Sequence, residues 1–383
     1  MNGILFSLVH SALTDKPMKC TDITPMSDEQ IHNIVKIAVR HDIAQLVVLG
    51  LKNNGLITEN SEQQYHQLIY KAVHREVKIR YEFDKICAVL AKEKIPFIPL
   101  KGSVIRDYYP EPWMRMSCDI DILIHEEDLE HAVNALECNL DYKADDRVAY
   151  HDISLFAPSG VHLELHFNIK ENMENIDRLL SDVWQNTVTP KQANEYCYSM
   201  TPEFFVFHHI CHMAHHFVHG GCGIKPFVDM YIISNRFEYN DALLREILRK
   251  CDMESFYENV LYVTDVWFGE ETHNYLSKQV EEYILKGGVY GSLENRVMVA
   301  QGQQGSKVKY AMSRIFLPYN SLINFYPILK TKKWLFPFMQ IVRWFRLIFC
   351  GGLNRGIHEM KINQTISADK ASAVKIFLEN IGL

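Results

Sequence analysis

The stretch CDIDILI, residues 118–124, constrains the fold more than any other part of the chain. Its apolar residues are typical of a buried β-strand, yet Asp119 and Asp121 interrupt them at alternate positions. Alternate side chains of a strand point to one face of a sheet, so both carboxylates share a face and Ile120 and Ile122 take the other. Burying an unpaired carboxylate costs several kcal/mol. We therefore expect either a cation or an exposed strand end to compensate for the two charges.

The composition is that of an ordinary soluble globular protein. The chain has 383 residues, of which 48% are hydrophobic and 23% charged, and this length predicts two or three domains. The net charge of -7 gives no overall positive field to attract nucleic acid, although a local basic patch is compatible with it. The nine cysteines include no Cys-x-x-Cys pair, so we expect no disulfide framework and no zinc knuckle. Scattered free thiols favour a cytoplasmic location.

No segment of the sequence predicts a transmembrane helix. The first residues lack the basic region and cleavage site of a signal peptide, so we expect a helix there. The most apolar stretch is WLFPFMQIVRWFRLIF, residues 334–349, which Pro337, Arg343 and Arg346 interrupt. We expect it to form an amphipathic helix packed on the protein, and contact with a membrane surface is the alternative.

The hydrophobic pattern divides the chain into three predicted domains. Residues 1–93 have helical periodicity, with a capping-box pattern that begins at Ser27. Residues 94–200 alternate between short strand and helix patterns, including two strands joined by a Pro-Ser-Gly turn. Residues 201–383 return to helical periodicity after a Thr-Pro helix start. The sequence thus predicts an α+β fold, with a small mixed β-sheet core between an N-terminal helical segment and a large C-terminal helical domain.

A third acidic residue can join the two aspartates from the segment VHLELHF. On a strand, His162, Glu164 and His166 of this segment share one face. If this strand neighbours the Asp-x-Asp strand, three carboxylates converge and repel one another unless divalent cations intervene. Carboxylate oxygens of this kind select Mg²⁺ or Mn²⁺. Two such ions that bridge phosphates are the usual machinery of phosphoryl and nucleotidyl transfer.

A candidate phosphate-binding turn precedes the acidic strand. Lys101, Gly102 and Ser103 lie where a strand pattern changes to a helix pattern. Glycine lets a phosphate approach the backbone, and free N–H groups at a helix start attract an anion. Lys101 and Arg115 supply positive charge for the same phosphates. The structural alternative is that the two aspartates only cap a strand edge and that Glu164 forms a salt bridge with Arg115.

The ordered combination of these motifs resembles the DNA polymerase β-like nucleotidyltransferase superfamily. More specifically, PLKGS, YYPEPWMRMSCDIDILI, LELHF and HMAHHFVHGGCGIKPFVDM are similar to a bacterial uncharacterised nucleotidyltransferase-like family found in sugar- and peptide-modifying gene neighbourhoods. The likeness covers about residues 95–235. It implies that the sheet region is a nucleotidyltransferase core and that Gly102 and Ser103 form the nucleotide-phosphate turn. It also implies a set of metal ligands, namely Asp119, Asp121 and Glu164.

The stretch FHHICHMAHHFVHGG places histidines 208, 212, 215, 216 and 219 on one predicted helix face. Three roles fit this face: a metal site, a wall that faces the substrate or nucleotide, or a polar face hydrogen-bonded between domains. For the wall we prefer His212, His215 and Asp229, with His166 from the sheet. His162 and His166 are each either a general base for the incoming nucleophile or a structural residue.

The leading hypothesis is a Mg²⁺-dependent (or Mn²⁺-dependent) nucleotidyltransferase. It would move an NMP group from a nucleoside triphosphate such as ATP to an acceptor hydroxyl or phosphate and release pyrophosphate. The expected partners are the nucleotide and a small-molecule or peptide acceptor that the sequence does not name; a tRNA-modifying enzyme is a variant of this hypothesis. The alternatives are a metal-dependent phosphohydrolase that uses the histidine-rich helix with Asp229, and a non-catalytic nucleotide-binding protein.

Overall fold

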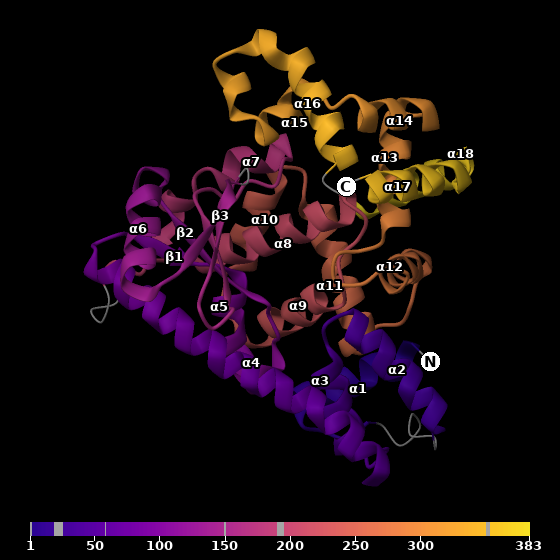
Figure 1. Ribbon diagram of the computed structural model, residues 1–383. Coiled ribbons are helices and arrows are strands. Elements are labelled where there is room, and N and C mark those ends of the chain that lie inside the picture. The colour runs from indigo at the N-terminus through magenta and orange to yellow at the C-terminus, as the bar shows by residue number, and fades with distance from the viewer. Residues whose placement is uncertain (1, 19–25, 58, 149–150, 190–194, 350–352) are drawn as a thin grey trace.

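The fold is described from a computed structural model (Figure 1), which describes residues 2–18, 26–57, 59–148, 151–189, 195–349 and 353–383. The chain begins with four helices: α1 (Asn2–Thr14), α2 (Asp28–Arg40), α3 (Ala44–Asn53) and α4 (Glu59–Lys92). Helix α2 has the expected capping box, in which the Ser27 side chain accepts from the Gln30 N–H and the Gln30 side chain accepts from the Ser27 N–H. Helix α4 runs from the N-terminal helices to the sheet (Figure 1).

The sheet has five strands in the order β1-β2-β5-β4-β3. Their bounds are β1 (Phe97–Pro99), β2 (Asp119–Ile124), β3 (Lys143–Val148), β4 (Asp152–Phe156) and β5 (His162–His166). Strands β2 and β5 are parallel and the other pairs are antiparallel, so the sheet is mixed as predicted. The Pro-Ser-Gly segment joins β4 to β5 as an antiparallel hairpin. A two-stranded sheet of β6 (Thr187–Val188) and β7 (Ser199–Met200) lies beyond it.

The two faces of the five-stranded sheet differ in chemistry. Ile120, Ile122 and Leu163 lie on the face that packs against α4 and against α6 (Leu129–Leu140) in one buried apolar cluster. The opposite face carries the aspartates of β2 and changes to apolar at Leu123, which belongs to the main core. The main core also includes Phe207 of the helix Pro202–Val218 (α8). This face of the sheet is therefore polar at one end and packed against helices at the other. A strand face of this kind can hold charged groups next to a rigid core.

The remaining chain is helical. The helices are α5 (Lys101–Ile105), α7 (Glu174–Leu180), α8 (Pro202–Val218), α9 (Lys225–Arg236), α10 (Asp241–Arg249), α11 (Glu254–Phe268), α12 (Tyr275–Leu285), α13 (Leu293–Gln304), α14 (Lys307–Ile315), α15 (Tyr319–Phe325), α16 (Phe336–Phe349), α17 (Leu353–Thr365) and α18 (Ala368–Ile381). The expected α+β architecture is confirmed. Helix α8 begins at Pro202, but the Thr201 side chain makes no capping hydrogen bond. Across the described residues, no helix is long and apolar enough to cross a membrane.

The main core joins parts of the chain that the sequence assigns to different domains. It contains Leu8 of α1, Val47 of α3, Phe227 of α9 and Phe256 of α11, all nearly inaccessible to solvent. The N-terminal helices therefore pack on the C-terminal helices as well as on the sheet region. The division of the chain at residues 93 and 200 stays a prediction.

Candidate active site

Two neighbouring parallel strands bring the acidic residues together. In the register of β2 and β5, Asp121 lies directly opposite Glu164, and Asp119 lies opposite His162. Because side chains at paired positions of parallel strands point to the same face, Asp119, Asp121 and Glu164 converge on the polar face of the sheet. The structure thus brings together the three residues that the sequence proposed as metal ligands.

Histidines flank the carboxylates on the same face. His166 Nε2 lies 3.3 Å from Asp121 Oδ1 and 3.6 Å from Glu164 Oε2. His162 Nδ1 lies 3.8 Å from Glu164 Oε1. The Asp121 and Glu164 side chains are 18% and 30% exposed, so the cluster is open to a ligand rather than covered by apolar groups.

The pKa values of these groups reflect crowded negative charge. Burial, together with the charges of Asp121 and Glu164, raises the pKa of Asp119 to about 6. Burial also acts to raise the pKa of Asp121, but the hydrogen bond and charge of His166 outweigh it and hold that pKa below its usual range. Burial opposes protonation of His166, yet its hydrogen bonds to Asp121 and Glu164 raise its pKa to about 9. His166 thus partly neutralises a cluster that has an excess of negative charge.

Donor atoms in this cluster are close enough to share a cation. Three groups have ligand atoms within 4.8 Å of one another: Asp119 with His162 and Glu164, Asp121 with Glu164 and His166, and His151 with Asp152 and His166. Glu164 belongs to two of these groups. Carboxylate oxygens predominate in the first two, and such a donor set fits Mg²⁺ or Mn²⁺.

The turn after β1 places a lysine beside the carboxylates. The Leu100 N–H donates to the Asp121 carbonyl at 3.0 Å, which fixes the start of α5 next to β2. The positive charge of Lys101, the first residue of α5, acts on Asp121 and His166. Ser103 lies two residues after Lys101 in the same short helix, and its N–H donates to the Leu100 carbonyl at 3.0 Å.

Two buried arginines, Arg106 and Arg115, pack against this turn. A Cβ at Gly102 would lie 2.8 Å from Arg115 Nη1, so the close approach of the guanidinium requires glycine there. Arg106 Nε donates to the Gly102 carbonyl at 2.7 Å, and Arg106 also contacts Glu76. The sequence did not single out Arg106, because only the fold brings it back onto the turn.

Arg115 and Asp229 form a buried ion pair. Arg115 Nε and Nη2 each lie 2.8 Å from an oxygen of Asp229, and the Tyr109 hydroxyl donates to Asp229 Oδ1 at 2.7 Å. The side chains of Arg115 and Asp229 are 8% and 2% exposed. Arg115 therefore pairs with Asp229 on α9, and the alternative in which it pairs with Glu164 is wrong. The sequence had placed Arg115 and Asp229 in separate roles.

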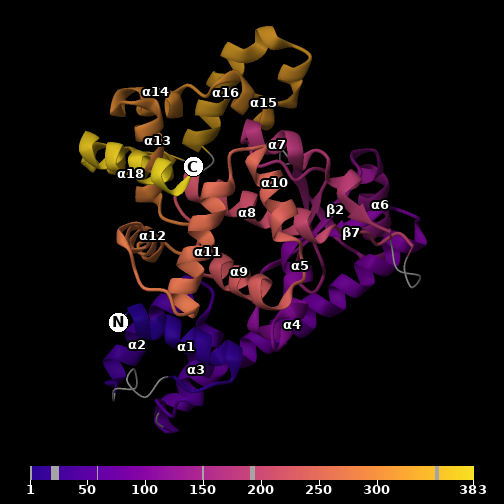
Figure 2. The same ribbon diagram turned by 180° about the vertical axis from the view of Figure 1, so that it is seen from behind.

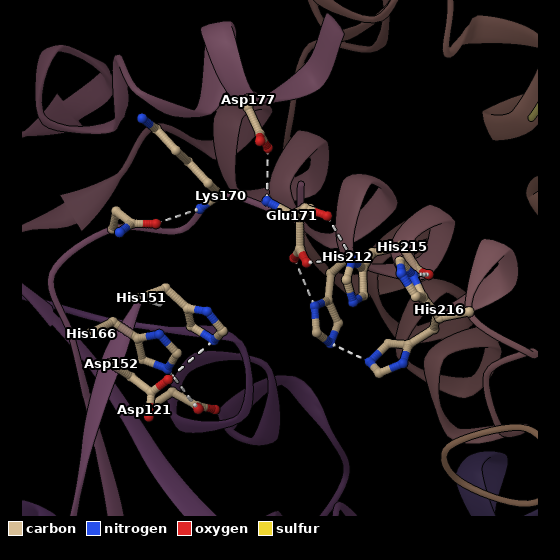
Figure 3. Close-up of polar contacts among 12 residues, drawn as sticks. Asp121, His151, Asp152, His166, Lys170, Glu171, Asp177, His212, His215 and His216 are labelled. Atoms are coloured by element: carbon tan, nitrogen blue, oxygen red, sulfur yellow. Dashed lines mark hydrogen bonds and ion pairs between the residues drawn. The ribbon is translucent and has the colours of Figure 1, made fainter. Parts of the chain in front are cut away.

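Two histidines of α8, His212 and His215, contact Glu171, which lies in the segment between β5 and α7 (Figure 3). His212 Nδ1 is 2.8 Å from Glu171 Oε1, and His215 Nδ1 is 2.7 Å from the Glu171 carbonyl. His216 Nε2 lies 2.9 Å from His212 Nε2. Burial acts to raise the pKa of Glu171, but His212, Lys101 and His215 hold it well below its usual value. The sequence offered no signal for Glu171, since its partners come from a distant helix.

The two polar clusters lie close to each other. Figure 3 shows Asp121 and His166 of the sheet on one side and Glu171, His212, His215 and His216 on the other. The charge of His212 helps to lower the pKa of Asp121, and the charge of Lys101 acts on both clusters. Among the described residues, the groups spaced to share a cation belong to the sheet and its flanks, and α8 contributes none.

A family model for uncharacterised nucleotidyltransferases matches residues 27–269, which include the acidic cluster, the turn and α8. The chain belongs to this nucleotidyltransferase family. The resemblance inferred from the sequence motifs is thereby confirmed, and the family supports a transferase that acts on nucleotides. Comparison with curated proteins and with solved structures gives no match.

Two further residues of this family member lie beside the cluster. Lys225 Nζ donates to Asp42 Oδ2 at 2.8 Å and to the Met116 carbonyl at 3.1 Å, and its charge acts on Asp119. Tyr290 is 70% exposed, and its ring centroid lies 6.3 Å from that of His216. Partial loss of solvent around it raises the pKa of Tyr290, and the negative charge of Asp119 adds to this. The glycine-rich sequence GGVYG around Tyr290 was the available signal for an exposed loop.

A cleft of about 490 Å³ lies next to two residues that contact Lys225. Asp42 and Met116, which both contact Lys225, form part of its wall. Basic side chains of α4 form another part: Lys71, His74, Arg75 and Lys78. Arg75 Nη1 also lies 3.5 Å from Cys118 Sγ, next to Asp119 in the chain. The cleft therefore places positive charge beside the acidic cluster.

Proposed function

We propose that the chain is a divalent-metal-dependent nucleotidyltransferase that transfers an NMP group from a nucleoside triphosphate to an acceptor. The observation that carries the proposal is the register of β2 and β5, which places Asp121 opposite Glu164 on a face that solvent reaches. Membership of the nucleotidyltransferase family supports the same reaction class. A bacterial origin and a cytoplasmic location remain predictions from the sequence.

Asp119, Asp121 and Glu164 would hold the divalent ions. When bound, Mg²⁺ or Mn²⁺ supplies charge that neutralises the triphosphate and activates the acceptor oxygen. The raised pKa of Asp119 supports this assignment, because a group crowded by two carboxylates gains most from a nearby cation. His166 would then position Asp121 and Glu164 through its contacts with both, which favours a structural role for it over that of a general base.

The protein groups around the ions would position the substrate. In the reaction, an acceptor oxygen bonds to the α-phosphorus and the bond to the bridging oxygen of pyrophosphate breaks. Lys101 would stabilise the charge that develops on the phosphates, and Gly102 and Ser103 would line them. Arg115 is engaged with Asp229, so we assign both residues to the support of the Gly102 turn rather than to phosphate contact.

The walls of the site would set its specificity. Tyr290 offers an exposed aromatic ring on which a nucleotide base can stack, beside His216. His212 and His215, held by Glu171, would form the facing wall. The basic cleft beyond Lys225 suits an acceptor that carries negative charge.

The test is release of pyrophosphate from each α-labelled nucleoside triphosphate with Mg²⁺ or Mn²⁺, and label transfer to candidate acceptors or to the protein itself. We expect Asp121→Asn to reduce both by at least about 10²-fold, the usual loss on removing one electrostatic stabiliser. Glu126→Gln, which removes an exposed carboxylate just after β2, is the matched control and should retain full activity. Equal pyrophosphate release by wild type and Asp121→Asn would refute the assignment.

The same experiment separates the two alternative functions. A phosphohydrolase that used α8 would release inorganic phosphate and keep its activity in Asp121→Asn. A non-catalytic nucleotide-binding protein would bind nucleotide without turnover in either metal. The contacts do not favour the phosphohydrolase: His212 and His215 are engaged with Glu171 and His216 with His212, and among the described residues α8 contributes no atom to a group spaced to share a cation.

A further inference from the structure

Helices α14, α15 and α16, residues 307–349, form a C-terminal arm that differs from the rest of the molecule. In both ribbon views α15 and α16 project at the end of the molecule away from the N-terminal helices (Figures 1 and 2). The arm carries a group of large apolar side chains that no described part of the chain covers. This surface plays no part in the proposed transfer reaction.

One face of α16 is apolar and exposed along its whole length. Its members follow the spacing i, i+3, i+4, i+7, i+10 and i+11, which defines a single stripe on a helix. They are between 44% and 78% exposed: Phe338, Ile341, Val342, Phe345, Ile348 and Phe349. Trp334, in the turn before α16, is 69% exposed and extends the stripe. Large apolar side chains gathered in this way mark a contact surface.

The opposite face of α16 is fixed to the rest of the arm. Arg343 Nη1 and Trp344 Nε1 donate to the Ile315 carbonyl at 3.0 and 2.9 Å, and Gln340 Nε2 donates to the Leu317 carbonyl. These bonds satisfy carbonyl groups at the end of α14 and just beyond it. They fix the orientation of α16 about its own axis, and in this orientation the apolar stripe faces solvent.

The charge of this part of the chain is opposite to that of the whole. Between Glu294 and Glu359 the sequence has no Asp or Glu, although the whole chain has a net charge of -7. The same interval contains ten basic residues: Arg296, Lys307, Lys309, Arg314, Lys330, Lys332, Lys333, Arg343, Arg346 and Arg355. Lys330, Lys332, Lys333 and Arg346 are exposed next to the apolar stripe. The surface therefore combines exposed aromatic and aliphatic groups with exposed lysines and an arginine that form no ion pair among the described residues.

We propose that the arm binds the surface of a lipid bilayer that contains anionic lipids, with the apolar stripe of α16 inserted among the acyl chains. An interfacial helix of this type lies in the plane of the membrane, with cations at the phosphate level. The 14 residues of α16 are too few to span a bilayer, so the helix lies on the membrane rather than across it. A second copy of this chain would be a poorer partner for the stripe than an anionic membrane, because a symmetric contact would bring the two sets of cations together.

The experiment is co-sedimentation of the full chain with vesicles of phosphatidylcholine alone or mixed with anionic phosphatidylglycerol. We expect binding to the anionic vesicles, weakened when the ionic strength is raised from about 0.1 M to about 1 M. The triple variant Phe338→Ser/Phe345→Ser/Phe349→Ser should lose at least about tenfold in binding, and so should Lys330→Gln/Lys332→Gln/Lys333→Gln. Tyr275→Ser, which removes a 78% exposed aromatic outside the arm, should bind as wild type does.

Other outcomes overturn the proposal. If anionic vesicles fail to retain the wild type, or retain the serine triple variant equally, the arm is not a membrane-binding surface. If instead the wild type is a dimer in solution and the serine variant a monomer, the stripe is an interface between copies. The thermal midpoint of each variant verifies that it is folded. Pyrophosphate release without vesicles should be unchanged in both arm variants, so this proposal and the proposed transfer reaction can fail separately.

Discussion

The polar face of the sheet and the C-terminal arm both reverse the usual distribution of side chains, in opposite directions. Around the sheet, charged groups such as Arg115 and Asp229 are almost fully buried, and each is paired. On the arm, large apolar groups such as Phe345 and Phe349 are exposed and unpaired. Apolar side chains are usually buried and charged side chains are usually exposed. Residues that depart from this distribution point to a function, because they do not stabilise the fold on their own. Buried charge in this protein depends on internal partners, whereas the exposed apolar stripe depends on an external one.

The largest effect should come from breaking a buried pair. Asp229→Ala leaves the Arg115 guanidinium buried without its partner, so we expect a loss of about 3–5 kcal/mol in the free energy of unfolding, measured in urea. The matched control is Glu379→Ala, which breaks an exposed pair with Lys375 and should cost at most about 0.5 kcal/mol. Equal effects of the two variants would remove the distinction between buried and exposed charge.

Low pH should also destabilise the protein, through protonation of a buried histidine, His41. His41 is fully buried, its ring nitrogens have no hydrogen-bond partner among the described residues, and burial lowers its pKa to about 4. Between pH 6.5 and about 4 the unfolded chain therefore binds a proton that the folded chain does not, so stability falls as the pH falls. We expect this group to account for about 3 kcal/mol of lost stability by pH 4.

Denaturant unfolding at several pH values tests this expectation. His41→Leu should flatten the dependence of stability on pH between 6.5 and 4, although His209, whose pKa burial also lowers to about 4, should keep part of it. His66→Leu, which removes an exposed histidine, is the control and should follow the wild-type curve. The prediction fails if His41→Leu follows it too.

A smaller effect should distinguish two glycines. Gly102→Ala places a Cβ against the Arg115 guanidinium, so we expect a loss of about 1–3 kcal/mol and weaker nucleotide binding. Gly356→Ala, in α17, meets nothing within 4 Å and should instead stabilise the protein by up to about 1 kcal/mol. Thermal unfolding of the two variants, with nucleotide titration of each, gives the sign of both effects. A stable Gly102→Ala variant that binds nucleotide normally would show that the turn does not need glycine.

The smallest effect on stability should be on the arm. Phe345→Ser removes a 59% exposed side chain, so the free energy of unfolding should change by no more than about 0.5 kcal/mol. Phe217→Ser removes a buried ring of the main core and should cost at least about 3 kcal/mol. If Phe345→Ser is as destabilising as Phe217→Ser, the stripe stabilises the fold itself and is not a surface kept for an external partner.

Much of the fold could be predicted from local patterns. Helix α4, the capping box at Ser27 and the hairpin of β4 and β5 all follow from hydrophobic period and turn chemistry. Strand β3 escaped prediction, because its sequence KADDRV lacks alternating apolar residues and depends on pairing with β4. The segment 334–349 was predicted to pack on the protein, yet only one face of α16 does so. Periodicity shows that a helix is amphipathic but not which of its faces meets the protein.

Local patterns were enough to predict the chemistry of the site, namely alternate aspartates in one apolar strand and a glutamate between histidines in another, because the period of a strand assigns each side chain to a face. Which of these groups meet depended on the three-dimensional arrangement of the strands and helices. The parallel register of β2 and β5 placed Asp121 opposite Glu164, and the packing of α9 against the turn gave Arg115 to Asp229. Partners distant in sequence depend on how the elements pack, and no local pattern specifies that packing.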